Sequence, residues 1–177
     1  MEHALYLFGG LSQKCEVLSD MYRFDLHTKE WDIIETTGVR PIERESHSAV
    51  YVKKSNKIVV YGGFRIGKTG NCDRLGDVLY FDIKSRCWSS PKIGGNIPSG
   101  RALHSAVLYK DLMYVYGGWV TNLLSASSWV CSSEILCFNT CKNYFINFTF
   151  TATHTWSSVR TPKYSPQARS GHAATLV

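Results

Sequence analysis

Three segments of the chain repeat one another, and each ends in a pair of glycines. They read LYLFGG at 5–10, KIVVYGG at 57–63 and LMYVYGG at 112–118. The glycine pairs are 53 and then 55 residues apart, and self-similarity at such a period is the signature of a repeat architecture. This period limits the fold more than any other feature, because each repeat has to form one small unit that packs against its neighbours.

Further landmarks keep the same order in every unit. An Arg-x-x-His element reads RESH at 44–47, RALH at 101–104 and RSGH at 169–172, so it recurs after 57 and then 68 residues. A tryptophan that closes each unit recurs after the same two steps. Between glycines and tryptophan, an acidic residue leads into an aromatic segment, as in GDVLYFD at 76–82. The repeated positions are Gly9, Gly10, Trp31, His47, Gly62, Gly63, Trp88, His104, Gly117, Gly118, Trp156 and His172.

The middle unit predicts a small antiparallel sheet. Its segments HSAVYV, KIVVYGG, DVLYFDI and CWSSP are short, rich in β-branched and aromatic residues, and separated by turn residues. We therefore expect four antiparallel strands in each unit and an all-β fold for the chain. The glycine pair marks the end of the second strand, where the backbone needs a positive φ to turn.

A unit of about 50 residues with four strands, a double glycine and a tryptophan resembles the kelch repeat, whose units are the blades of a β-propeller. The resemblance implies a kelch β-propeller fragment of about three four-stranded antiparallel blades. We expect an incomplete blade at 4–34, complete blades at 44–92 and 101–159, and the start of the next blade at 169–177. Because a ring typically has about four to eight blades, the chain is expected to hold only part of one.

The third unit indicates which kelch-repeat proteins the chain resembles most. Its glycine pair continues as GGWV, and 38 residues separate that pair from the closing tryptophan, compared with 21 and 25 in the other units. Together with RESHSAVYV and CDRLGDVLYFDI, this is similar to the kelch domains of the host cell factor family of chromatin-associated transcriptional co-regulators. The family's Leu-Asn pair appears as Phe138-Asn139, whereas the insertion at 142–155 departs from the family pattern.

The resemblance to host cell factors implies a protein-interaction scaffold in the nucleus, with the cytoplasm as a second compartment. Its propeller would dock short acidic and aromatic peptides of transcription factors, with the pattern acidic residue, His, any residue, Tyr. It would thereby bring histone-modifying complexes to promoters. The alternative is a substrate-recognition propeller of a BTB-kelch ubiquitin-ligase adaptor. That class has helical domains ahead of its repeats, and this sequence starts in a predicted strand.

Composition argues against other classes of function. The net charge of +6 is the difference between 20 Lys and Arg and 14 Asp and Glu. The basic residues are scattered in twos and threes and form no continuous stripe, so we expect no direct nucleic-acid binding. No apolar run approaches the roughly 18 residues of a membrane span, and a signal peptide is not visible, so a soluble, unsecreted chain without a membrane partner is expected.

The sequence also lacks a recognisable catalytic constellation. The six cysteines form no CxxC pair, and neither a copper-radical arrangement nor a close pair of carboxylates is visible. We therefore expect no metal, no cofactor and no enzymatic activity, with a kelch-type enzyme as the remaining alternative.

Candidate binding residues follow from the strand order. It places the loops after the glycine pairs and the loops between blades on one face, and only tight hairpins, such as that of Lys53 and Lys54, on the other. We expect binding on the first face, where arginines can pair with a carboxylate and a tryptophan can stack on an aromatic ring. The candidates are Arg44, Arg65, Arg74, Arg101, Trp119 and Arg169.

Structural roles are the alternative for several of these residues. Each arginine could be a surface group or a strut of its blade. The histidines recur at one blade position, so we expect them to support the blades, and we expect the tryptophans to pack between blades. The acidic residues before the third strands are expected to accept hydrogen bonds from backbone amides; they are Asp20, Asp77 and Glu134.

Overall fold

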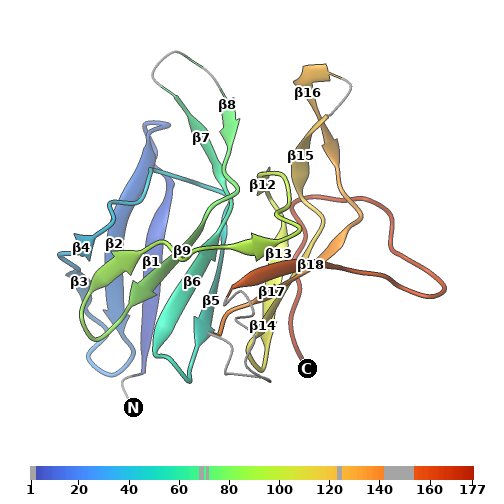
Figure 1. Cartoon of the computed structure of the whole chain (residues 1–177). Coiled ribbons are helices and arrows are strands. Elements are labelled where there is room, and N and C mark those ends of the chain that lie inside the picture. The colour runs from blue at the N-terminus through green and yellow to red at the C-terminus, as the bar shows by residue number, and fades with distance from the viewer. Residues whose placement is uncertain (1–2, 68–69, 71, 123–124, 142–153) are drawn as a thin grey trace.

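The computed structural model describes residues 3–67, 70, 72–122, 125–141 and 154–177. Throughout this part of the chain the regular elements are β-strands, and none is a helix. Three sheets follow one another along the chain as neighbouring blades of a propeller (Figure 1). The predicted all-β propeller is therefore confirmed. Among the described residues, no helix has the length and apolar character needed to cross a membrane.

The first blade has three strands. They are β1 (Ala4–Leu11), β2 (Val17–Asp25) and β3 (Trp31–Ile33), and they pair in that order. Because β1 contains the glycine pair, it is the second strand of the repeat. Within the described ranges no strand pairs with the other edge of β1, so the sheet described for this blade has three strands.

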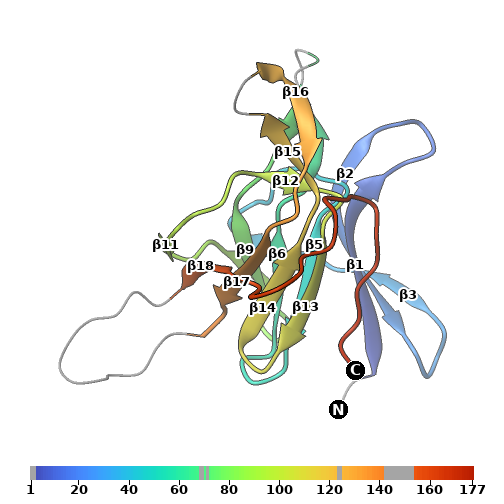
Figure 2. The same cartoon turned by 90° about the vertical axis from the view of Figure 1, so that its right-hand side faces the viewer.

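The second and third blades share one topology. The second consists of β5 (Ser48–Val52), β6 (Lys57–Tyr61), β9 (Val78–Asp82) and β10 (Cys87–Ser89), with β4 (Thr37–Gly38) parallel to β10. The third consists of β13 (Ser105–Tyr109), β14 (Leu112–Tyr116), β17 (Ile135–Asn139) and β18 (Thr155–Val159), with β11 (Gly94–Gly95) parallel to β18. The inner strands β5 and β13 lie next to each other (Figure 2). The outermost strands β4 and β11 were not predicted, because two residues are too few to show a strand pattern.

Two hairpins project from the same side of the propeller (Figure 1). After the glycine pair of the second blade come β7 (Phe64–Ile66) and β8 (Cys72–Arg74). After that of the third blade come β15 (Trp119–Asn122) and β16 (Ser125–Cys131), and β12 (Arg101–Ala102) pairs with β15. The sequence predicted loops at both places, and the structure extends them into strands. Most of the insertion at 142–155 lies outside the described residues.

Aromatic rings fill the contacts between blades. Trp88 is 2% exposed, and its ring centroid lies 4.7 Å from that of Phe8 in the first blade. Trp156 is equally buried and lies 4.6 Å from Tyr61 in the second blade. Trp31 differs, since it is 52% exposed. The expectation that all three tryptophans pack between blades therefore fails at Trp31, because no blade precedes the first one in this structure.

The glycine pairs bring each blade against the start of the next. Gly62 has a φ of 67°, and a Cβ there would lie 2.6 Å from the carbonyl oxygen of Arg101. Gly63 donates its N–H to the same carbonyl at 2.9 Å. Equivalent contacts join Gly9 and Gly10 to Arg44, and Gly117 and Gly118 to Arg169. Two glycines recur because the turn needs a positive φ and the close approach leaves no room for a side chain.

Candidate functional site

Two of the predicted peptide-binding residues, Arg44 and Arg101, are fully buried. Both terminal nitrogens of Arg44 donate to the carboxylate of Asp77 at 2.8 Å, and Nη1 also donates to the Gly62 carbonyl at 3.0 Å. In Arg101, Nη2 donates to the carboxylate of Glu134 at 2.9 Å, and Nη1 donates to the Gly117 carbonyl at 3.0 Å. A ligand has no access to either guanidinium group in this conformation. The prediction that Arg44 and Arg101 bind a peptide is therefore wrong for this conformation, since both side chains hold the blades together through internal hydrogen bonds.

The acidic residues before the third strands also have a different role from the one expected. Asp77 and Glu134 accept hydrogen bonds from arginine side chains, whereas backbone amides were predicted as their donors. The arginine's own backbone bonds to the preceding blade, as Arg101 N–H does with the Leu75 carbonyl at 3.1 Å. Each arginine consequently ties two blades together. Asp20 occupies the same position in the first blade, and its Oδ1 is buried without a hydrogen-bond partner.

The repeated histidines connect the inner strands of neighbouring blades. His104 Nε2 and Ser48 Oγ form a hydrogen bond of 2.8 Å, and His172 and Ser105 repeat it at the same distance. Burial, together with the charge of a nearby arginine, lowers the pKa of His104 to about 3 and that of His47 to about 4. Both side chains are therefore neutral at pH 7, which suits a buried structural role.

The two hairpins border a groove of about 900 Å³ on the loop face. Strands β7 and β8 form one wall, and β15 and β16 form the other. The turns before β5 and β13 form the floor, with Ser46 and Leu103 at their centres. Both of these residues have a positive φ, 54° and 57°, which is uncommon for residues other than glycine. Arg74 and Trp119, two of the predicted residues, line this one groove.

A cation and two indole rings form the most distinctive part of the groove. The rings of Trp119 and Trp129 meet edge to face, with centroids 3.9 Å apart and planes at 87°. The guanidinium carbon of Arg74 lies 5.2 Å from the centre of the Trp129 ring, and Trp129 is 48% exposed. In the described part of the chain, Arg74 has no carboxylate partner. Sequence reasoning missed Trp129, which lies in the long third unit outside the repeated positions.

The two remaining candidates contribute less to the groove. Arg65 pairs with Asp73 at 2.9 Å and with Glu43 at 3.8 Å, so nearby carboxylates already compensate its charge. Its pairing with Asp73 joins β7 to β8 and holds the hairpin in shape. Arg169 is exposed, and its Nε donates to the Gln167 carbonyl at 3.0 Å. Arg169 does not line the groove.

The chemistry of the groove is that of recognition. A guanidinium group can pair with a carboxylate, and exposed indole rings can pack against an aromatic or apolar side chain. Arg and Trp are also the residue types that most often dominate binding energy in protein interfaces. Within the ranges that the structure describes, no group of three or more His, Cys, Asp or Glu side chains is arranged to hold a metal ion.

Comparisons with known proteins agree with this architecture. The family described as KLHDC2/KLHL20/DRC7 Kelch-repeats domain matches residues 1–177. Host cell factor 1 of Homo sapiens is 34% identical over 198 residues, which cover 97% of this chain and 9% of that protein. The host cell factor homolog hcf-1 of Caenorhabditis elegans is 34% identical, and host cell factor 2 of Homo sapiens is 33% identical. Each of these two matches covers 97% of this chain and 23% of the relative, so the chain spans less than a quarter of these proteins.

A solved structure has the same fold. The protein in "Structure of YjhT" superposes with a TM-score of 0.66 at 18% sequence identity, over 95% of this chain and 51% of that one. The match to the family over the full chain and the identity to host cell factors over nearly all of it confirm the resemblance that the repeats indicated. The chain belongs to the kelch-repeat family of β-propellers.

Proposed function

We propose that this propeller docks short extended peptides of transcription regulators in the groove between its two hairpins. Its kelch blades and its similarity to host cell factors indicate a protein-interaction domain in transcription co-regulation, and not an enzyme. The finer proposal, which names the groove and the kind of peptide, rests mainly on one observation. Arg74 lies over the exposed ring of Trp129 beside Trp119, so one surface offers a cation and two aromatic rings.

The size of the groove suits a few residues of a peptide. Its volume of about 900 Å³ lies within the range of roughly 300–1,000 Å³ that is common for binding pockets. In an extended peptide, alternate side chains point to the same side and are about 7 Å apart. In the pattern acidic residue, His, any residue, Tyr, the His and Tyr rings are two residues apart and therefore lie on the same side of the peptide. They can face the tryptophans together while the carboxylate of the first residue turns toward Arg74.

The charges around the groove favour a single carboxylate over an acidic run. Among the described lining residues, Arg74 is the one cation, and Asp73, which also lines the groove, is paired with Arg65. Glu45 adds a negative charge at the floor. Within the described part of the lining, a peptide with several acidic residues would meet the Glu45 carboxylate without gaining a second unpaired cation. The groove should therefore select one well-placed carboxylate next to aromatic side chains.

The partners and the location follow from the same proposal. The peptides belong to transcription factors, and the longer protein brings histone-modifying complexes to the same promoters in the nucleus. A ubiquitin-ligase adaptor with a kelch propeller would use the same loop face for a substrate. The similarity to proteins named host cell factor favours the co-regulator.

A titration with a fluorescent peptide of the pattern acidic residue, His, any residue, Tyr tests the proposal. Arg74→Glu should weaken binding at least about tenfold, or about 1.4 kcal/mol, because it replaces the cation with a like charge. Lys53→Glu reverses the same charge on the opposite face and serves as the matched control, with no more than about twofold change expected. A larger effect at Lys53 than at Arg74 would place binding on the other face and overturn the proposal. Arg65 is left unchanged in this test because Asp73 already pairs with it.

A further inference from the structure

Three residues that line the groove, Glu45, Phe64 and Arg74, lie in one row across paired segments. Glu45 and Phe64 each donate the backbone N–H to the other's carbonyl, at 2.9 and 2.8 Å, and Phe64 pairs with Arg74 in the hairpin of β7 and β8. Residues directly opposite each other in an antiparallel pair have their side chains on the same face. The row therefore presents a carboxylate, a phenyl ring and a guanidinium group to one surface, and all three side chains are partly exposed.

The two charges of this row are separate from each other. Neighbouring strands are about 4.8 Å apart, so two steps separate the backbones of Glu45 and Arg74 by about 10 Å. Across the part of the chain that the structure describes, neither side chain forms an ion pair, whereas Glu43 and Asp73 both pair with Arg65. Of the two carboxylates in the described groove lining, Glu45 is therefore the one whose charge is not compensated.

A ligand that brings only a carboxylate to Arg74 would not satisfy the groove. A peptide in the groove displaces water from the Glu45 carboxylate, and a carboxylate that loses its water without gaining a partner is costly. A cationic group on the peptide would replace that water with a charge-assisted hydrogen bond. Opposite charges at two points of the groove would also fix the direction in which the peptide lies.

We propose that Glu45 determines the specificity of this site by binding a cationic side chain of the peptide, next to the carboxylate that pairs with Arg74. This inference rests on the proposed function, because it concerns the same peptide in the same groove. In the pattern acidic residue, His, any residue, Tyr, the histidine supplies the cation when its ring is protonated. The ring can pack against the tryptophan wall while one of its N–H groups donates to Glu45 at the floor. Lysine in place of this histidine would supply the same charge permanently.

Recognition of a protonated histidine makes binding depend on pH. Free histidine has an ordinary pKa of about 6.5, and pairing with Glu45 would raise that pKa in the complex. The bound peptide then holds more protons than the free peptide, so binding tightens as the pH falls from 7.5 to 5.5. The described lining contributes Glu45, Asp73, Arg74 and Cys72 as charged or titratable groups, and the wall of β15 and β16 contributes indole rings. His47, two residues from Glu45, has a pKa of about 4 and stays neutral over this range.

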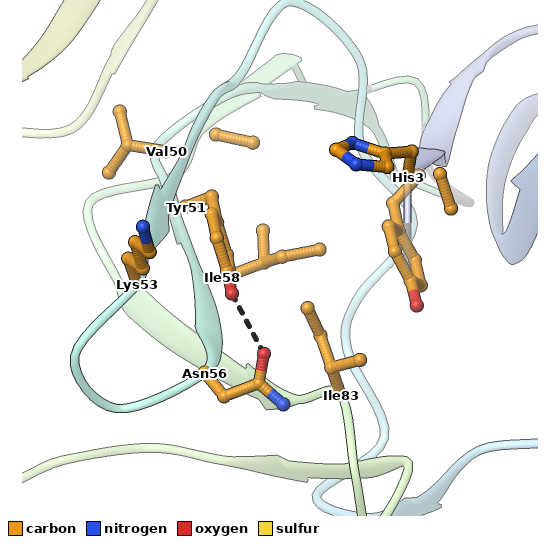
Figure 3. A pocket seen from close by; sticks show the side chains of 10 residues that line it. His3, Val50, Tyr51, Lys53, Asn56, Ile58 and Ile83 are labelled. Atoms are coloured by element: carbon orange, nitrogen blue, oxygen red, sulfur yellow. Dashed lines mark hydrogen bonds between the residues drawn. The ribbon is translucent and has the colours of Figure 1, made fainter. Parts of the chain in front are cut away.

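A second hollow has a different set of charges. It has a volume of about 670 Å³, lies between β1 and β5, and is lined largely by apolar side chains such as Val50 and Ile58 (Figure 3). Among its described lining residues, Lys53 is the one Lys or Arg, and none is Asp or Glu. This hollow could pair with a carboxylate of the peptide but would leave a cation of the peptide without a partner. Binding there would not respond to a change at Glu45.

Titrations of the fluorescent peptide at pH 7.5 and pH 5.5 test the role of Glu45. The native chain should bind about threefold more tightly at pH 5.5, the size of effect expected of a partly exposed ion pair. Glu45→Gln should remove this gain, because it keeps the shape and the backbone contacts of Glu45 without the charge. Glu43→Gln makes the same change outside the groove and should keep the gain. A peptide with lysine in place of histidine should bind the native chain equally at both pH values.

Reversing the charge gives a second test at constant pH. Glu45→Lys should weaken binding of the lysine peptide at least about threefold, and a peptide with glutamate at that place should bind Glu45→Lys better than it binds the native chain. This rescue would also show that the variant is folded.

The outcomes separate this inference from the proposed function. An equal gain at pH 5.5 in the native chain and in Glu45→Gln, with Arg74→Glu still weakening the peptide, would overturn the role of Glu45 and leave the proposed function standing. Failure of the glutamate peptide to prefer Glu45→Lys would count against Glu45 in the same way. Unchanged binding in Arg74→Glu would overturn the proposed function, and this inference with it.

Discussion

Replacing Trp88 with alanine tests the packing that joins the first two blades. Trp88 is 2% exposed, and its ring lies 4.7 Å from Phe8 in the first blade and 5.0 Å from Phe81 in its own. The truncation would leave a cavity between two sheets whose strands are held in place by hydrogen bonds. Neither neighbouring ring can move far enough to fill it without disturbing its own blade.

The size of the effect follows from the buried area. A tryptophan buries on the order of 200 Å², and at about 25 cal/mol per Å² this corresponds to roughly 5 kcal/mol. That figure is an upper estimate, because the unfolded chain already shields some of the ring and alanine keeps the Cβ atom. We therefore expect Trp88→Ala to lower the free energy of unfolding by about 3–5 kcal/mol, the usual range for truncating a buried aromatic residue.

Urea unfolding, followed by circular dichroism, measures this loss. The chain supplies its own control, because Trp31 occupies the same blade position but is 52% exposed. Trp31→Ala should cost only about 1–2 kcal/mol, since less apolar surface is lost from the folded state. Equal losses for the two variants would show that Trp88 is not buried between blades and would refute the blade packing described above.

Two further predictions concern buried charges. Asp77→Asn should lower the free energy of unfolding by about 2–4 kcal/mol, because it leaves the buried Arg44 without its carboxylate. The double variant Arg44→Met with Asp77→Leu should lose less stability, because no buried charge is left unpaired. A lower urea midpoint for the double variant than for Asp77→Asn would refute the structural role of this ion pair. The pKa values of His47 and His104, about 4 and about 3, lie below the ordinary 6.5, so the folded state binds fewer protons and stability should fall as the pH drops below about 6.5. At pH 4.5 each histidine should cost about 2 kcal/mol, and a urea midpoint that stays constant from pH 7 to pH 5 would contradict this.

Much of the fold could be predicted because each repeated residue has the same structural role in every complete blade. The double glycine is needed where a strand turns against the next blade, and the tryptophan fills the contact between sheets. The repeat also predicted the small antiparallel sheets of the propeller. It could not predict β4 and β11, because their parallel pairing depends on the path between blades and not on a local pattern.

The candidate site was predictable only in part, because a sequence does not show which arginines are buried. Arg44 and Arg101 recur in the repeat, and that recurrence was itself the sign of a structural role that each blade needs. Arg74 and Trp119 lie outside the repeated positions, on segments that differ between blades. Trp129 was missed because its place opposite Arg74 depends on two hairpins from different blades.

The most direct test of the proposed function is to map the peptide's contact on the folded chain by nuclear magnetic resonance. Adding the unlabelled peptide to the ¹⁵N-labelled chain should shift the amide signals of Phe64–Ile66 and Cys72–Arg74, together with the indole signals of Trp119 and Trp129. These groups border the groove, and Arg74→Glu should remove the shifts. Shifts confined to the hairpin at 53–56 on the opposite face, with the indole signals unchanged, would contradict the proposal that this propeller binds peptides between its two hairpins.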